Sequence, residues 1–118
     1  MNDMSRILLV GLLYMLGGQI LIWYQTNGQF MWKWADRNPI WMAIIFSFPI
    51  SYLFIYATKY IVMYSEGELW PGRLIGFGIG VTSFAILTYI HMGEGLTTKT
   101  IVSLILAVAL VSIQIFWK

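Results

Sequence analysis

The chain has 118 residues, of which 59% are hydrophobic and 10% are charged, whereas an average soluble domain is about 45–50% apolar and about 25% charged. A chain of this length forms one domain at most, so its apolar excess cannot be hidden in a large soluble core and is expected to face lipid or other subunits. The formal net charge of +2 comes without a basic run, and there is no cysteine and a single histidine, which excludes nucleic-acid binding, disulfides and thiolate metal sites.

The first predicted element is a membrane-spanning helix over residues 6–24. Its apolar run, ILLVGLLYMLGGQILIWY, holds no charged residue and approaches the roughly 20 residues that an α-helix needs to cross a hydrocarbon core of about 30 Å. The polar segment that follows, QTNGQFMWKWADRN, has two open interpretations. Residues 29–36 form a short interfacial helix with Phe30, Met31 and Trp34 on one face, or the whole segment is a mobile loop.

The second predicted helix spans residues 39–63. Asn38 stands where a helix N-cap is expected, and Pro39 suits the first helical position. Inside the helix, Pro49 removes one backbone donor and its ring clashes with the carbonyl of Ile45, so a kink is expected there. A kinked helix often marks the substrate site of a membrane transporter, but proline is also ordinary in membrane helices, and both interpretations stay open.

The stretch LWPGRLIGFGIGVTSF, residues 69–84, is rich in glycine. A phosphate-binding loop would need a preceding strand and a Gly-Lys-Ser/Thr ending, and neither pattern occurs. We therefore expect a third spanning helix over residues 72–92. Glycines at steps of four leave a strip of bare backbone on one helix face, against which another helix can pack closely. We call this set the glycine stripe: Gly72, Gly76 and Gly80, extended by Ser83, with Gly78 lying off it.

A fourth spanning helix is predicted over residues 98–117. Ser103 and Ala107, four residues apart, give it a shorter strip of small residues suited to helix packing. The predicted fold class is all-α, an integral membrane four-helix bundle that forms a single domain over residues 1–118. Tryptophans near the predicted helix ends match the aromatic belt at membrane interfaces. The expected interface anchors are Trp23, Trp34, Trp41, Trp70 and Trp117.

Four spans place both termini on the same side of the membrane. That side carries four cationic residues and the opposite side three. By the positive-inside rule the difference favours cytoplasmic termini, but it is small enough to permit dual topology, in which copies insert both ways up and pair antiparallel. The cations on the side of the termini are Arg6, Lys59, Arg73 and Lys118, and those on the opposite side are Lys33, Arg37 and Lys99.

No carboxylate lies at membrane depth in the predicted helices, so a proton relay through a buried acid is not expected. The polar residues at depth are neutral, and on the first two helices they recur at helical spacings. Gln19 is the most informative, because a mid-membrane amide needs partners either in the bundle or in a ligand, and both interpretations remain open. The predicted substrate cavity comprises Tyr14, Gly18, Gln19, Ser47, Pro49, Ser51, Tyr52 and Tyr56.

Two segments give the chain a family resemblance. Residues 70–72, Trp-Pro-Gly, open the glycine-rich third helix, and residues 93–97, Gly-Glu-Gly-Leu-Thr, precede the fourth. With four helices in this length, the chain resembles the drug/metabolite transporter superfamily, and more narrowly its single-repeat members, the small multidrug resistance proteins and an uncharacterised sister family. The resemblance implies half of a transport fold in a bacterial inner (cytoplasmic) membrane: a homodimer whose first three helices line a cavity and whose fourth dimerises through Ser103 and Ala107.

One departure from that resemblance bears on function. Small multidrug exporters carry an essential glutamate in the middle of the first helix, and this first helix has no acid at mid-length, so proton-coupled export of cations by that mechanism is not expected. We expect instead a transporter or facilitator of a small neutral or weakly polar solute, with no cofactor, no metal and no enzymatic activity. The alternative is a non-transporting accessory or structural subunit that packs in a larger membrane complex through its glycine-rich third helix.

Overall fold

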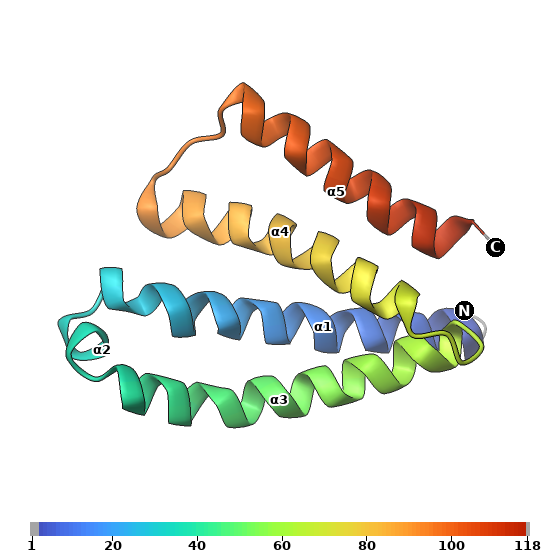
Figure 1. Cartoon of the computed structure of the whole chain (residues 1–118), viewed down its shortest axis with the longest axis horizontal. Helices are drawn as coiled ribbons and strands as arrows, with labels where there is room; N and C mark the ends of the chain where they lie inside the picture. The colour runs from blue at the N-terminus through green and yellow to red at the C-terminus, as the bar shows by residue number, and fades with distance from the viewer. Residues whose placement is uncertain (1–2, 118) are drawn as a thin grey trace.

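The computed structural model describes residues 3–117, which fold into helices joined by short connections (Figure 1). In chain order the elements are α1 (Asp3–Asn27), a 3₁₀ turn η1 (Gly28–Phe30), α2 (Lys33–Arg37), α3 (Pro39–Tyr64), α4 (Trp70–Met92) and α5 (Thr98–Phe116), and no strand occurs within the described range. The helices α1, α3, α4 and α5 are each long and apolar enough to cross a membrane. The all-α prediction is therefore confirmed, and the chain has the architecture of a multi-pass membrane protein. Lys118, one of the cations compared above, lies outside the described residues.

The helices form two antiparallel pairs, α1 with α3 and α4 with α5, and the pairs meet along α1 and α4 (Figure 1). Because the α3–α4 loop lies at the end where α1 begins, α1 and α4 run parallel to each other. α5 ends at that same end of the bundle, whereas the α1–α3 connection and the α4–α5 loop lie at the other. This order of packing leaves α3 and α5 on the outside of the molecule.

Some helix ends differ from the predicted ranges by a few residues. α1 continues to Asn27 and α4 begins at Trp70, against the predicted ranges 6–24 and 72–92. Residues 29–36 are divided between η1 and α2 instead of forming one helix. Asn38 occupies the N-cap position of α3, but its side chain does not cap that helix. Its Nδ2 donates to the carbonyl of Trp34 at 2.8 Å and so closes α2.

The glycine stripe of α4 faces the inside of the bundle. A Cβ added to Gly76 would lie 3.2 Å from Met15 Cε, and one added to Gly80 would lie 2.9 Å from Gln19 Oε1. The missing side chains on α4 are thus replaced by long side chains from α1, which is how small residues let membrane helices approach closely. We call this α1–α4 contact the glycine seam. Gly72 makes the corresponding contact with α3, where an added Cβ would lie 3.5 Å from Ile61 Cγ2.

The contact between α4 and α5 is built around Gly78. A Cβ added there would overlap Val111 Cγ2 and would lie 3.0 Å from the carbonyl oxygen of Ala107. Ala107 is the buried residue of α5, and the Tyr64 hydroxyl donates to the carbonyl of Ile115 at 3.3 Å. α5 is therefore attached to the bundle through a narrow line of contacts, with most of its surface exposed.

The buried core lies where α1, α3 and α4 meet. Its members are Met15, Ala57, Ile61 and Ile75, and the last three are 0% exposed. In lipid such a core is not stabilised by hiding apolar groups from water, so close packing and dispersion attraction hold it. The core fixes the three helices that position the candidate site.

Candidate functional site

Two cavities border the glycine seam. The first, of about 580 Å³, lies between α1, α3 and α4 and contains polar side chains; we call it the polar groove. The second, of about 460 Å³, lies between α1, α4 and α5; we call it the apolar cleft. The seam thus separates a cavity bounded by α3 from one bounded by α5.

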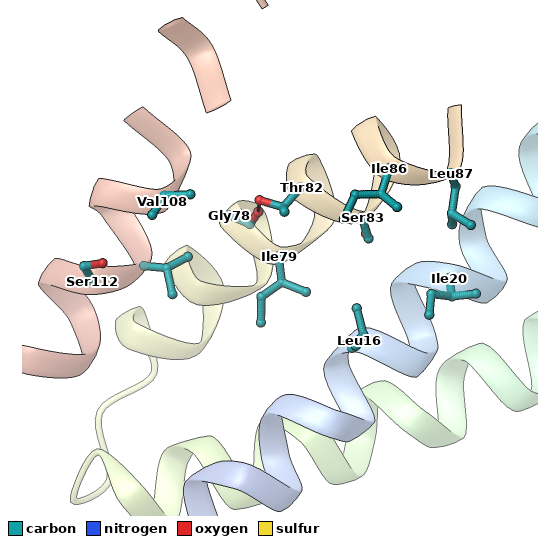
Figure 2. A pocket seen from close by; sticks show the side chains of 11 residues that line it. Leu16, Ile20, Gly78, Ile79, Thr82, Ser83, Ile86, Leu87, Val108 and Ser112 are labelled. Carbon is teal, nitrogen blue, oxygen red and sulfur yellow. Dashed lines mark hydrogen bonds between the residues drawn. The ribbon is translucent and has the colours of Figure 1, made fainter. Parts of the chain in front are cut away.

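The apolar cleft is drawn in Figure 2, with Leu16 and Ile20 of α1 opposite side chains of α4 and α5. Its hydroxyl groups on α4 are satisfied within that helix. Thr82 Oγ1 donates to the carbonyl of Gly78 at 2.9 Å, and Ser83 Oγ donates to that of Gly80 at 3.1 Å. The cleft therefore offers a mainly apolar surface that suits an acyl chain, with Ser112 of α5 as its remaining hydroxyl.

The floor and rim of the polar groove differ in character. Met15, Gly72 and Gly76 are buried at its floor, whereas Thr58 and Arg73 are exposed at its rim. Because these two side chains are exposed, the groove is open at its rim. The remaining lining residues are Gln19, Ile22, Phe54, Leu69 and Phe77.

Gln19 links the groove to the glycine seam. Its Nε2 donates to the carbonyl oxygen of Gly76 at 3.3 Å, so the amide has a partner in the bundle while it also lines the groove. An amide inside a membrane bundle needs such a partner because lipid offers none. Of the two interpretations left open by the sequence, the interhelical bond is present, and contact with a ligand stays a prediction.

Arg73 and Thr58 bring further polar groups to the groove. Arg73 lies close to the start of α4, and Thr58 lies on the facing part of α3. Among residues 3–117, neither side chain makes a hydrogen bond or an ion pair. The groove therefore contains a guanidinium and a hydroxyl whose hydrogen-bonding capacity the described chain does not use.

The predicted tyrosines form a separate aromatic cluster beside the groove. Tyr14 stacks on Tyr56 and Tyr60, with ring centroids 5.6 Å and 5.9 Å apart, and Tyr52 lies against Tyr56 at 4.9 Å. Lys59 Nζ lies 5.8 Å and 5.9 Å from the centroids of Tyr56 and Tyr60, within cation–π distance. Tyr14 and Gln19 are five residues apart, which rotates them by about 140° around a helix of 3.6 residues per turn, so they face different sides of α1.

The other predicted cavity residues lie in two further places. Gly18 packs against the ring of Phe54, since an added Cβ would lie 2.8 Å from Phe54 Cε1. Ser47, Pro49 and Ser51 are exposed on α3, which continues as one helix through Pro49. Ser47 Oγ accepts a hydrogen bond from Gln25 Nε2 at 3.3 Å. A single chain thus does not gather the eight predicted residues around one cavity, and of these only Gln19 lines the polar groove.

At the end of the bundle remote from the α3–α4 loop, aromatic residues of α1 contact α4. Trp23 is 2% exposed, and its indole N–H donates to Thr88 Oγ1 at 3.0 Å. This differs from the lipid-facing ring expected of an interface anchor, because Trp23 satisfies its polar atom inside the bundle. Trp34, Trp41, Trp70 and Trp117 are each between 53% and 78% exposed.

The two small residues of α5 singled out in the sequence, Ser103 and Ala107, differ in exposure. Ala107 is 4% exposed and packs against Gly78 of the same chain. Ser103 is exposed, and its hydroxyl donates to the carbonyl of Lys99 at 3.0 Å. A dimer contact through α5 would therefore have to use its outer face, on which Ser103 but not Ala107 is accessible.

Three residues matter more in the structure than their sequence pattern indicates: Gly78, Thr58 and Arg73. The position of Gly78 off the stripe predicts either a second close contact or local flexibility, and the structure shows the close contact, with α5. Arg73 enters the sequence-based prediction only through its charge. The spacing of Arg73, Gly76 and Phe77 places them on one helix face, and that signal was available in the sequence. No similar signal relates Thr58 to this face, because the two are on different helices.

Within residues 3–117 there is no group of three His, Cys, Asp or Glu side chains placed to hold a metal ion. No family model matches the chain, and no curated protein or solved structure matches it significantly. The class that the described residues define is therefore that of a four-helix, multi-pass membrane bundle with a polar groove between α1, α3 and α4.

Proposed function

We propose that this protein is a transporter or facilitator of a small solute that acts as a homodimer, with the polar groove as part of the solute path. The observation that carries the proposal is the placement of Gln19, Thr58 and Arg73 around one cavity between membrane-spanning helices. Of the three, Gln19 is partly buried, and polar groups inside a membrane protein commonly mark substrate or ion pathways. The proposed transport differs from proton-coupled cation export, because α1 has no acid at mid-length.

A homodimer accounts for the polar outer surface of α3. Ser51 and Tyr52 are exposed there, and Ser47 is exposed beside them. Ser47 bonds to Gln25 and Tyr52 to Tyr56, whereas the Ser51 hydroxyl has no partner among residues 3–117. A second helix bundle can supply one, which lipid cannot. Half of a drug/metabolite transporter fold, which the sequence resembles, would also need a second copy to close its cavity.

The transport proposal is tested by reconstituting the protein into liposomes and following osmotic swelling in glycerol or urea. We expect faster swelling than in protein-free liposomes. Gln19→Met, which keeps the length of the side chain but removes the amide, is expected to slow solute entry. Gln29→Met is the matched control, since Gln29 is exposed and its amide bonds locally to the carbonyl of Thr26. Swelling equal to that of empty liposomes, combined with one subunit per particle in single-molecule photobleaching, would overturn the proposal.

The alternative is a non-transporting accessory subunit. The sequence predicts docking through the glycine stripe, but Met15, Gln19 and Ile61 of the same chain already cover that stripe. The observation that keeps the alternative is α5, whose outer face carries exposed large apolar residues, among them Ile101, Ile105 and Leu106. A subunit of this kind would dock by α5 and would leave liposome permeability unchanged.

A further inference from the structure

The polar groove combines one permanent positive charge with apolar walls. Arg73 is at its exposed rim, and the rings of Phe54 and Phe77 line it together with Leu69 and Ile22. An arginine side chain stays protonated at any physiological pH. A molecule that fills the groove therefore meets a cation at one point and hydrocarbon elsewhere.

No negative charge of the described chain offsets this cation. The acidic residues nearest in sequence are Glu66 and Glu68 of the α3–α4 loop, and neither lines the groove. Among residues 3–117, Arg73 forms no ion pair. The neighbouring cation, Lys59, lies over the tyrosine cluster and is not a lining residue. The lining of the groove therefore carries one positive charge and no negative charge.

A guanidinium presents a planar fork of N–H donors that matches a carboxylate or a phosphate, and such charge-assisted bonds are the strongest hydrogen bonds in proteins. The hydroxyl of Thr58 can add a further donor, since it has no partner among the described residues. The geometry points to an amphipathic anion as the occupant: we propose that the polar groove binds a carboxylate or phosphate at Arg73 and Thr58, with the apolar tail between Phe54 and Phe77.

This inference goes beyond the proposed function, because anion binding at Arg73 requires only the polar groove and not solute transport through it. An acidic lipid of the surrounding membrane and a free amphipathic acid both have the required chemistry. They differ in how they reach the groove, because a lipid enters sideways through the exposed rim, whereas a free acid also enters from water. The experiment below separates the two sources.

Binding is measured by native mass spectrometry of the full-length protein, released from a non-ionic detergent in the presence of one probe at a time. The probes are dodecanoate, phosphatidylglycerol, phosphatidylcholine and dodecyltrimethylammonium. We expect one of the two anions to be retained, and the zwitterion and the cation not to be retained. Retention of phosphatidylglycerol without dodecanoate assigns the lipid as the source, and retention of dodecanoate alone assigns the free acid.

The residue responsible is tested with Arg73→Gln, for which anion affinity is expected to fall about tenfold or more, the scale of a lost charge-assisted bond. Arg73→Lys keeps the charge without the fork and should bind with intermediate affinity, which keeps the test valid if Arg73→Gln misfolds. The matched control is Arg6→Gln, because Arg6 is an exposed cation of α1 outside the groove.

Equal retention of all four probes, or equal anion affinity in Arg73→Gln and Arg6→Gln proteins of unchanged helicity, would overturn the inference. The two proposals can fail separately. Anion binding without solute entry in the liposome assay refutes transport and leaves the binding site intact. Solute entry without selective anion binding refutes the anion site and leaves the transport proposal intact.

Discussion

Trp23 and Tyr24 are neighbours in sequence, and both tie the end of α1 to the end of α4. The Tyr24 hydroxyl and His91 Nε2 are 2.8 Å apart, and the His91 ring stacks on that of Trp23 with centroids 5.2 Å apart. With the Trp23–Thr88 bond, these contacts fix the register between two parallel helices. The stabilisation comes from several ring contacts and hydrogen bonds that act together, so a single substitution underestimates their total contribution to the free energy of unfolding.

Removing one oxygen atom tests the contribution of the Tyr24–His91 hydrogen bond to stability. Tyr24→Phe removes the hydroxyl but keeps the ring, so the free energy of unfolding is expected to fall by about 0.5–1.5 kcal/mol. The effect of His91→Ala should be smaller in the Tyr24→Phe background than alone, because the two side chains share the bond. Both are measured by reversible unfolding in mixed micelles.

Tyr89→Phe serves as the control for this cycle, since Tyr89 is exposed on α4 and makes no hydrogen bond through its side chain among the described residues. The free energy of unfolding of the Tyr89→Phe variant is expected to equal that of the unchanged protein. Additive effects of Tyr24→Phe and His91→Ala would show that the hydroxyl and the imidazole do not interact.

Single residues also show how far the sequence could locate a site. Gln19 was identifiable because a mid-membrane amide always needs a partner. Tyr14, Ser47 and Tyr52 were grouped with it from spacing within each helix. Spacing defines a face but not the neighbour that the face meets, so the grouping could not be decided before the helices were packed. The predicted cavity as a whole remains a hypothesis about a dimer.

At the scale of elements, the apolar lengths of α1, α3, α4 and α5 were sufficient to predict four spanning helices, since a bilayer imposes a minimum span. The partners of α4 were not predictable in the same way. A stripe at steps of four identified Gly72, Gly76 and Gly80 as a packing face, but nothing in the sequence said that the odd glycine, Gly78, would face α5. Helix pairing depends on the fit of two surfaces, which one helix alone does not specify.

The two glycine faces of α4 should respond differently to an added methyl group. At Gly76 the neighbour is the flexible end of Met15, so Gly76→Ala is expected to change the free energy of unfolding by less than about 1 kcal/mol. At Gly78 the neighbours are the branched carbon of Val111 and the backbone oxygen of Ala107. These cannot move aside without shifting α5, so Gly78→Ala should destabilise by about 1–3 kcal/mol.

Gly95→Ala is the control for both substitutions, because no atom lies within 4 Å of a Cβ built there. Thermal unfolding followed by circular dichroism gives the comparison. A cross-link between cysteines placed on α4 and α5 should also form more slowly in Gly78→Ala than in Gly76→Ala. Equal losses at the two positions would mean that α5 is not held through Gly78.

For the whole molecule, α1 begins at the same end of the bundle as the α3–α4 loop (Figure 1). The chain has no cysteine, so single cysteines at Asp3, Glu68 and Gly95 can be labelled without background. In a single topology, Asp3→Cys and Glu68→Cys react with a membrane-impermeant maleimide from one side of a vesicle and Gly95→Cys from the other. Labelling of every position from both sides would instead establish dual topology. The near balance of charges between the two sides cannot decide this by itself.

The attachment of α5 has a consequence for assembly. Residues 93–97, which connect it to α4, have no regular secondary structure, and α5 meets the bundle along the line of Gly78, Ala107 and Val111. Two copies that exchanged their last helices across an opened connection would form the same close contacts that one copy forms alone. Such an exchange, known as domain swapping, would leave the contacts of each α4–α5 interface unchanged. The balance between closed monomers and interlocked pairs would then depend on the protein concentration in the membrane.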